Sequence, residues 1–155
     1  MPRRNPGTGP GTGGAVAVEL FVDTSAWYPL ADPRHPDHGA SAAALTDRVR
    51  AGARVVTTNL VLAETHALLL RRVGGRVALR FLREVLREPL LVEPSTPVLE
   101  LRAIEEWLEH FDDHDFSPVD GVSIVIMRDR NISEALTLDH RFAAAGFTMV
   151  PSAGG

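Results

Sequence analysis

The feature that most constrains the fold of this chain is a regular alternation of short apolar runs and longer helical stretches. When a helix separates two strands, it carries the chain back to the edge of the sheet where the first strand began, so the strands pair in parallel. The sequence therefore predicts an α/β fold with three layers, α/β/α, around a central, mostly parallel sheet of four to five strands. The predicted strands are 18–22, 54–58, 90–93, 135–138 and 148–150.

Capping residues help to place the helices between these strands. Thr58 or Asn59 is a suitable N-cap, Pro97 suits a first helical position, and Gly146 suits a helix end. The predicted helices are 25–30, 36–51, 59–72, 75–88, 97–111 and 117–130, with a short one that starts near 140.

The size and composition of the chain fit one domain. Its 155 residues suit a single compact unit, which we place at 15–152, preceded by a flexible Gly- and Pro-rich leader at 1–14. The chain has no cysteine, which excludes disulfides and fits a cytoplasmic protein, and its apolar runs are too short to span a membrane. Its net charge of -4, with 16 arginines and no lysine, argues against a globally basic nucleic-acid binder.

Four carboxylates lie where the carboxyl edge of a parallel sheet would bring them together. Asp23 follows the first predicted strand and Asp139 follows the fourth. Glu64 lies in the second turn of the helix after the second strand, and Asp120 in the first turn of its own helix. Because ligands bind at the carboxyl ends of parallel strands, we expect these four acids to converge.

Three of these acids also have a structural explanation. Asp23 and Asp139 could each cap the helix that follows. Asp120 completes the sequence "SPVD", in which Ser117 and Asp120 have the spacing of a capping box.

Glu64 is harder to explain structurally. Its helix is apolar nearly all round, which predicts a buried helix, and no cation stands three or four residues away from Glu64. A buried glutamate needs a partner, which would be either an arginine from another segment or a group that the sequence does not contain. Asp120 likewise has no cation on its helix before Arg128.

A cluster of these acids requires a counter-charge. Two carboxylates about 5 Å apart repel by about 3 kcal/mol at an effective dielectric constant near 20. Three or four together would approach the whole stability of a domain, about 5–15 kcal/mol. Oxygen ligands without cysteine select Mg²⁺ or Mn²⁺ over zinc, and such a site suits hydrolysis of a phosphoester.

Four segments of the sequence carry a family resemblance. "FVDTSAWYPLAD", "TTNLVLAETHALL", "FSPVDGVSIVIMRDR" and "ALTLDHRFAAAGF" resemble the signature segments of the PIN-domain ribonucleases, and within that family the VapC type of bacterial toxin. The resemblance extends over about 19–150. It implies a PIN-like fold and an Mg²⁺- or Mn²⁺-dependent endonuclease that hydrolyses RNA phosphodiester bonds. By motif match, the metal ligands and catalytic residues would be Asp23, Glu64, Asp120 and Asp139, directly or through water.

The resemblance also implies supporting residues and partners. Thr24 or Ser25 would contact Asp23 or the substrate. Many relatives have serine or threonine where this chain has Val119, so one supporting hydrogen bond is expected to be missing. Toxins of this type are made with a small antitoxin that blocks the acidic site, and commonly form a homodimer.

Arginines on the helix predicted at 75–88 are candidates for binding RNA. Arg76, Arg80, Arg83 and Arg87 are four, three and four residues apart, a spacing that places them on one helix face. There they could hold phosphates that flank the cut. The alternative is a solvated face paired with the acids of the next helix, which are Glu100, Glu105, Glu106 and Glu109.

Two further functions remain open from the sequence. One is a catalytically silent PIN-like module that binds RNA or protein, and the other is a housekeeping PIN ribonuclease without an antitoxin. Intact carboxylates favour an enzyme over the silent module.

Overall fold

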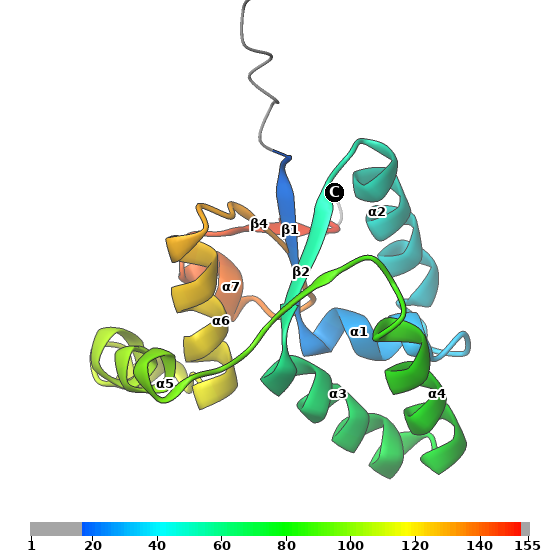
Figure 1. Ribbon diagram of the computed structural model, residues 1–155, viewed down its shortest axis with the longest axis horizontal. Coiled ribbons are helices and arrows are strands. Elements are labelled where there is room, and N and C mark those ends of the chain that lie inside the picture. Colours follow the sequence, from blue (N-terminus) through cyan, green and yellow to red (C-terminus); the bar gives the residue numbers. More distant parts are fainter. Residues whose placement is uncertain (1–16, 153–155) are drawn as a thin grey trace, which may run out of the picture.

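The computed structural model describes residues 17–152, and the predicted leader at 1–14 lies outside these residues (Figure 1). A five-stranded sheet forms the centre, and every pairing in it is parallel, as predicted. The strand order is β3-β2-β1-β4-β5, so β1 is the middle strand. The strands are β1 (Glu19–Val22), β2 (Arg54–Thr58), β3 (Leu91–Glu93), β4 (Glu134–Leu136) and β5 (Thr148–Val150).

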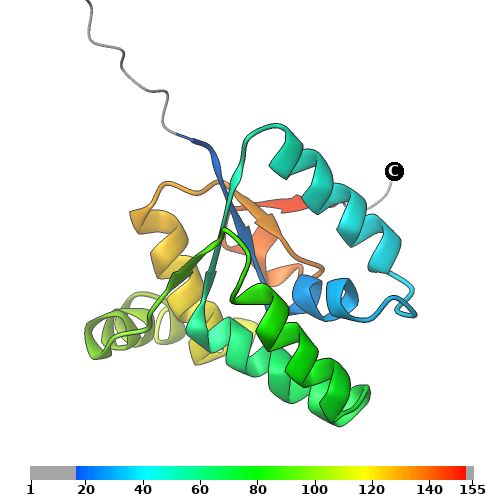
Figure 2. The ribbon, with the colours of Figure 1, turned by 45° about the vertical axis from the view of Figure 1, so that its right-hand side comes forward.

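Helices cover both faces of this sheet, which gives the predicted three layers. In Figures 1 and 2, α1 to α4 lie on one side of the sheet, and α5 and α6 lie on the other. None of the helices within 17–152 is long and apolar enough to cross a membrane. The helices are α1 (Thr24–Ala31), α2 (His38–Arg50), α3 (Asn59–Arg72), α4 (Gly75–Val85), α5 (Pro97–Ala103), α6 (Pro118–Asp129) and α7 (Arg141–Ala144).

The core lies on either side of β1. Leu20, Phe21 and Val22 are almost wholly buried, and the ring of Phe21 stacks on that of Phe142. A second apolar cluster joins α5 to α6, and Gly121 allows their close approach. A Cβ atom at Gly121 would lie 3.1 Å from the Cβ of Ala103, so the glycine sets how closely the start of α6 packs on α5.

The helix predicted at 97–111 is divided. After α5, the residues Ile104–Leu108 form a π-helical turn, in which the N–H of Glu109 donates to the carbonyl of Ile104. The wider turn buries Trp107, whose ring stacks on Phe111 at a centroid distance of 4.7 Å. A 3₁₀ turn at Asp112–His114 then leads to α6. Side-chain packing has here replaced the regular helical spacing that the sequence pattern predicted.

Candidate active site

The order of the strands places a switch point at the carboxyl ends of β1 and β4, where parallel sheets bind ligands, and we call this region the acidic crevice. From β1 the chain builds the sheet in one direction through β2 and β3, and then in the other through β4 and β5. Such a switch point leaves an opening between neighbouring strand ends. Asp23 directly follows β1 and Asp139 lies just beyond β4, so these two predicted site residues flank the switch point.

Asp23 is held firmly at this position. Its backbone N–H donates to the carbonyl of Leu136 on β4 at 3.1 Å, and only 4% of the residue is exposed. Its Oδ2 atom accepts hydrogen bonds from the Ser25 hydroxyl at 2.9 Å and from the Thr137 hydroxyl at 3.2 Å. Asp23 is therefore the N-cap of α1, and it is also a carboxylate buried at the crevice.

Two hydroxyls connect Asp23 to the loop that carries Asp139. The Ser25 and Thr137 hydroxyl oxygens lie 3.0 Å apart, and the N–H of Asp139 donates to the Thr137 oxygen at 3.0 Å. Ser25 thus makes the contact with Asp23 that the sequence predicted. The buried hydroxyl of Thr24 has no hydrogen-bond partner within the described residues, although the Thr24 backbone N–H helps to lower the pKa of Asp23. A contact of Thr24 with the substrate stays a prediction. Thr137 was missed, and its only signal in the sequence is a hydroxyl residue two positions before Asp139.

Asp120 combines a capping role with a place at the crevice. Its Oδ2 atom accepts from the N–H of Ser117 at 2.9 Å, while its own N–H donates to the Ser117 hydroxyl at 3.1 Å. The predicted capping box is therefore confirmed. Only 7% of Asp120 is exposed, so a second carboxylate is buried near Asp23.

A guanidinium lies among these acids, and the sequence did not predict it. Arg141 donates from Nη2 to Asp139 Oδ2 at 2.7 Å, and its Nη1 atom lies 3.5 Å from Asp120 Oδ2. Nη1 also donates to the carbonyl of Asp115 at 2.6 Å. Arg128, the nearest cation along the helix of Asp120, instead lies over the Trp107 ring. The counter-charge comes from a distant segment of the chain.

The expectation of a buried Glu64 was wrong. Helix α3 buries one face, including Val61, Thr65 and Leu69, whereas Glu64 is exposed and Leu70 is 51% exposed. Apolar residues on the solvent side made α3 look buried all round in the sequence. Glu64 therefore needs no buried partner, and its carboxylate is accessible from solvent.

The pKa of Glu64 is nevertheless affected by the other acids. Partial desolvation and the negative charges of Asp23 and Asp120 raise its pKa, against the opposing effect of Arg141. Glu64 is exposed, so water limits the effect of desolvation and leaves the two negative charges as the main cause of the raised pKa. Their effect places Glu64 within electrostatic range of both buried acids.

The pKa shifts of the two strand-end acids are opposite in sign. Burial raises the pKa of Asp23, and the charge of Asp120 adds to the rise against the hydrogen bonds from Ser25. Burial would also raise the pKa of Asp139, but the hydrogen bonds from Arg141 outweigh it and lower that pKa. Arg141 therefore compensates Asp139, and Asp23 remains a charge that the fold disfavours.

These shifts predict opposite pH dependences for two variants of the metal-free protein. A raised pKa means that the stability contributed by Asp23 is present below its ordinary value of 3.8 and is lost as pH rises through the folded-state pKa. We therefore expect the unfolding free energy of wild type to fall relative to Asp23→Asn as pH rises from about 4. For Asp139→Asn the sign reverses: the advantage of wild type exists near neutral pH and disappears on acidification. The Asp139 difference develops below about pH 4, because its lowered pKa lies under the ordinary value of 3.8. Urea unfolding between about pH 2 and 8 therefore measures both differences, and parallel curves would contradict the assignment.

The donor chemistry of the site fits a hard divalent cation, but the observed geometry is arranged around Arg141. Carboxylate oxygens from Asp23, Glu64, Asp120 and Asp139 are the ligands that Mg²⁺ and Mn²⁺ prefer. Within residues 17–152, however, no three histidine, aspartate or glutamate side chains are gathered closely enough to hold a metal ion. Binding a cation would therefore require side chains at the crevice to move.

Within residues 17–152, no ion pair joins the predicted RNA-binding arginines to the four acids. Arg76, Arg80 and Arg83 are exposed on α4, as is Arg87 just beyond it, and within 17–152 no ion pair involves any of them. The alternative pairing with acids of the next helix is wrong, because α5 packs on α6 and Glu106 pairs with Arg102. These arginines remain available to other partners.

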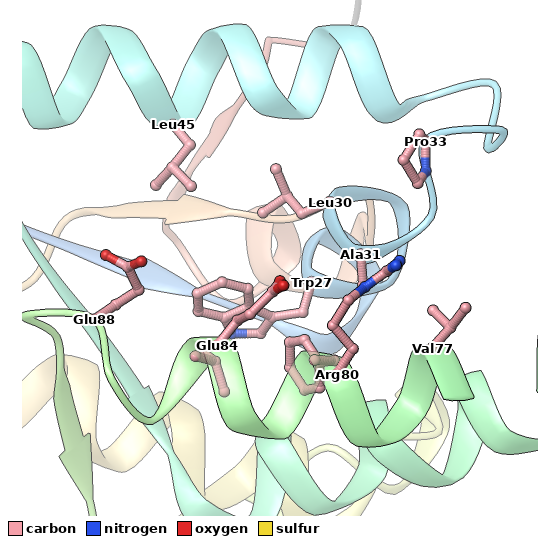
Figure 3. A pocket seen from close by; sticks show the side chains of 11 residues that line it. Trp27, Leu30, Ala31, Pro33, Leu45, Val77, Arg80, Glu84 and Glu88 are labelled. Atoms are coloured by element: carbon pink, nitrogen blue, oxygen red, sulfur yellow. The ribbon is translucent and has the colours of Figure 1, made fainter. Parts of the chain in front are cut away.

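A groove of about 590 Å³ lies beside α4 and contains none of the four acids. Figure 3 shows Trp27 and Leu30 of α1 facing Arg80 and Glu84 of α4, with Leu45 of α2 above them. The groove and the acidic crevice are therefore separate features of the surface.

Comparison with known proteins agrees with this architecture. The protein family described as PIN domain matches residues 20–148. Over 131 residues the chain is 37% identical to the 23S rRNA-specific endonuclease VapC20 of Mycobacterium tuberculosis. The matched region covers 84% of this chain and 97% of VapC20.

Solved structures show the same fold. The crystal structure of Mycobacterium tuberculosis VapC20, described as a Sarcin-Ricin loop cleaving toxin, matches with a TM-score of 0.76 and 36% identity, over 83% of this chain and 96% of that one. VapBC2 from Rickettsia felis, bound to a DNA fragment from its promoter, matches with a TM-score of 0.64 and 13% identity, over 85% and 97% of the two chains. FitAcB from Neisseria gonorrhoeae has a TM-score of 0.55 at 13% identity, over 84% and 95%. The family match, the similarity to VapC20 and the shared fold together establish that this chain belongs to the PIN-domain family.

Proposed function

We propose that this protein is an endoribonuclease that hydrolyses phosphodiester bonds in RNA. The proposal is supported by the acids near the switch point: Asp23 and Asp120 are buried, Asp139 is bound by Arg141, and the charges of Asp23 and Asp120 act on exposed Glu64. The 37% identity to a 23S rRNA-specific endonuclease supports RNA as the substrate class, and ribosomal RNA as the first substrate to examine.

Asp23, Glu64, Asp120 and Asp139 would hold Mg²⁺ or Mn²⁺, directly or through water. When bound, such an ion lowers the pKa of a water molecule and screens the charge of a phosphate. The chain itself orients the Asp23 carboxylate, because the hydroxyls of Ser25 and Thr137 both donate to its Oδ2 atom. A ligand that is already oriented costs less to organise when the cation arrives.

Cleavage of purified RNA tests the proposal. The protein is incubated with ribosomal RNA and with DNA of matched sequence, in EDTA and then with excess Mg²⁺ or Mn²⁺. We expect fragments from RNA alone, none in EDTA, and recovery when the ion is restored. RNA that binds but stays intact with both ions would favour the silent binding module instead.

We also propose a small antitoxin as partner and a homodimer as the assembly, since the chain resembles the VapC-type toxins. Co-expression with a small protein encoded next to this gene tests the first part: that protein should copurify with the chain and suppress cleavage. If no such inhibitor exists, the housekeeping ribonuclease is the better description.

Light scattering of the purified chain tests the proposed homodimer, and a monomer at micromolar concentration would reject the dimer.

The arginines of α4 give a prediction about substrate binding. Replacing Arg76, Arg80 and Arg83 together with glutamine should weaken RNA binding and flatten its dependence on salt, because each phosphate contact contributes about 0.7 to the logarithmic slope for single strands. The triple variant should therefore lose about 2 units of slope. Arg50→Gln, on exposed α2, is the control. An unchanged slope in the triple variant would show that α4 does not contact the RNA backbone.

A further inference from the structure

We propose that Arg141 is the built-in counter-ion of the acidic crevice, that a divalent cation binds by displacing its guanidinium, and that the released guanidinium then binds an RNA phosphate. This inference rests on the proposed function and adds a residue to it. Arg141 lies two positions after Asp139, at the first position of α7.

The contacts of Arg141 show that it bridges the two sides of the crevice. Its Nε and Nη2 atoms donate to Asp139, which follows β4, while Nη1 lies 3.5 Å from Asp120, on the opposite helix. A third contact, from Nη1 to the carbonyl of Asp115, anchors the guanidinium to the loop before α6. One side chain thus joins three segments that meet at the site.

Charge explains why this position is occupied. Four carboxyl groups, those of Asp23, Glu64, Asp120 and Asp139, lie near Arg141, whose guanidinium stays protonated at any ordinary pH. Hydrogen bonds to Asp139 raise the pKa of Arg141 further, with a contribution from Asp120. Arg71 also acts on Glu64 at longer range, but Arg141 is hydrogen-bonded to one acid of the cluster and ion-paired to a second.

The same contacts put Arg141 in competition with a metal ion. The Oδ2 atoms of Asp139 and Asp120 both face the guanidinium. A divalent cation needs carboxylate oxygens within about 2.0–2.2 Å, so an oxygen that turns to the cation gives up much of its contact with Arg141. This competition explains why the donors are chemically suitable and yet are not gathered for coordination.

Arg141 is able to move and to remain useful. Its side chain is 41% exposed, so displacement does not open a hole in the core. It is attached beside the crevice, where its planar fork of donors suits two oxygens of a phosphate. A displaced Arg141 is therefore in position to hold the RNA backbone next to the bond that is cut.

Two variants and a matched control test the proposal. Arg141→Gln removes the charge, and Arg141→Lys keeps the charge without the fork. The control is Arg102→Gln, because Arg102 also binds carboxylates, Glu106 and Asp129, but at the opposite end of α6 from Asp120. Mn²⁺ affinity is measured by paramagnetic resonance of the free ion, without RNA.

Arg141→Gln is expected to change Mn²⁺ affinity and RNA affinity in opposite directions. Arg141→Gln should bind Mn²⁺ about tenfold more tightly than wild type, whereas at saturating Mn²⁺ its KM for RNA should rise about tenfold. Arg102→Gln should leave both values unchanged. If Arg141 only stabilised the fold, its replacement would weaken both Mn²⁺ binding and RNA binding. If Arg141→Gln does not fold, Arg141→Lys decides: tighter Mn²⁺ binding than wild type supports the proposal, and equal or weaker binding overturns it.

Two failures can be told apart. Wild type that binds Mn²⁺ and cleaves RNA, with Arg141→Gln binding Mn²⁺ no more tightly, overturns this inference and leaves the proposed function intact. Wild type that neither binds Mn²⁺ nor needs a divalent ion for cleavage rejects the metal site and the inference together.

Discussion

The Asp23→Asn variant is expected to lose RNA cleavage by about 10³-fold or more while remaining folded. Asp23 is the most buried of the four acids, and two hydroxyls fix its carboxylate at the crevice. Asparagine has nearly the same shape and can still cap α1, so local structure is retained and the charge is lost. Initial cleavage rates at saturating Mg²⁺ measure the effect.

The same variant should be more stable than wild type in the absence of metal. The pKa of Asp23 is raised, which means that the folded protein disfavours its charge, so removing that charge should add on the order of 1 kcal/mol to the unfolding free energy. Asp47→Asn, on exposed α2, is the control for both measurements and should change neither. Cleavage at the wild-type rate by Asp23→Asn would remove Asp23 from the active site.

Glu64→Gln is expected to reduce cleavage by about 100-fold, with little change in stability. Glu64 is exposed on α3, so the amide costs little in packing, but the crevice loses an accessible carboxylate. Desolvation and the charges of Asp23 and Asp120 raise the pKa of Glu64, so the unfolding free energy of wild type should fall as pH rises through that pKa. The unfolding free energy of Glu64→Gln should not show this fall.

The apparent Mg²⁺ affinity distinguishes a metal ligand from a distant charge. If Glu64 holds the ion, the Mg²⁺ concentration needed for half-maximal cleavage should rise in Glu64→Gln. Glu105→Gln, on the exposed π turn after α5, removes a similar charge from the other side of the molecule and serves as the control. Equal effects of the two substitutions would mean that only net charge matters.

Much of the fold could be predicted because local patterns and long-range packing agree. The strand at 54–58, the helix at 59–72 and the last strand at 148–150 have the bounds that the sequence predicted. The helix expected at 97–111 is interrupted by the π turn at Ile104–Leu108, in which Trp107 is buried in the apolar cluster that includes residues of α6. Because this packing involves α6, it cannot be predicted from the segment 97–111 alone.

The places of Asp23 and Asp139 at one edge of the sheet could be predicted, whereas the exposure of Glu64 and the surroundings of the acids could not. Strand order brings Asp23 and Asp139 to one edge, and a pattern of parallel strands is enough to predict this. Thr137 and Arg141 became visible only when the loop after β4 folded back against Asp23 and Asp120. The nearest cation along the helix of Asp120 is Arg128, whereas the cation that pairs with Asp120, Arg141, lies 21 positions further along the chain (141 against 120).

The place of β4 in the sheet has a consequence for the time at which this protein becomes active. Asp23 and Glu64 leave the ribosome early, but β4 is synthesised late, and with it Thr137, Asp139 and Arg141. Until β4 pairs with β1, the Asp23 N–H lacks its partner, the carbonyl of Leu136, and the residues that follow β4 are not beside Asp23. The candidate active site is thus complete only after β4 has been synthesised and has paired with β1.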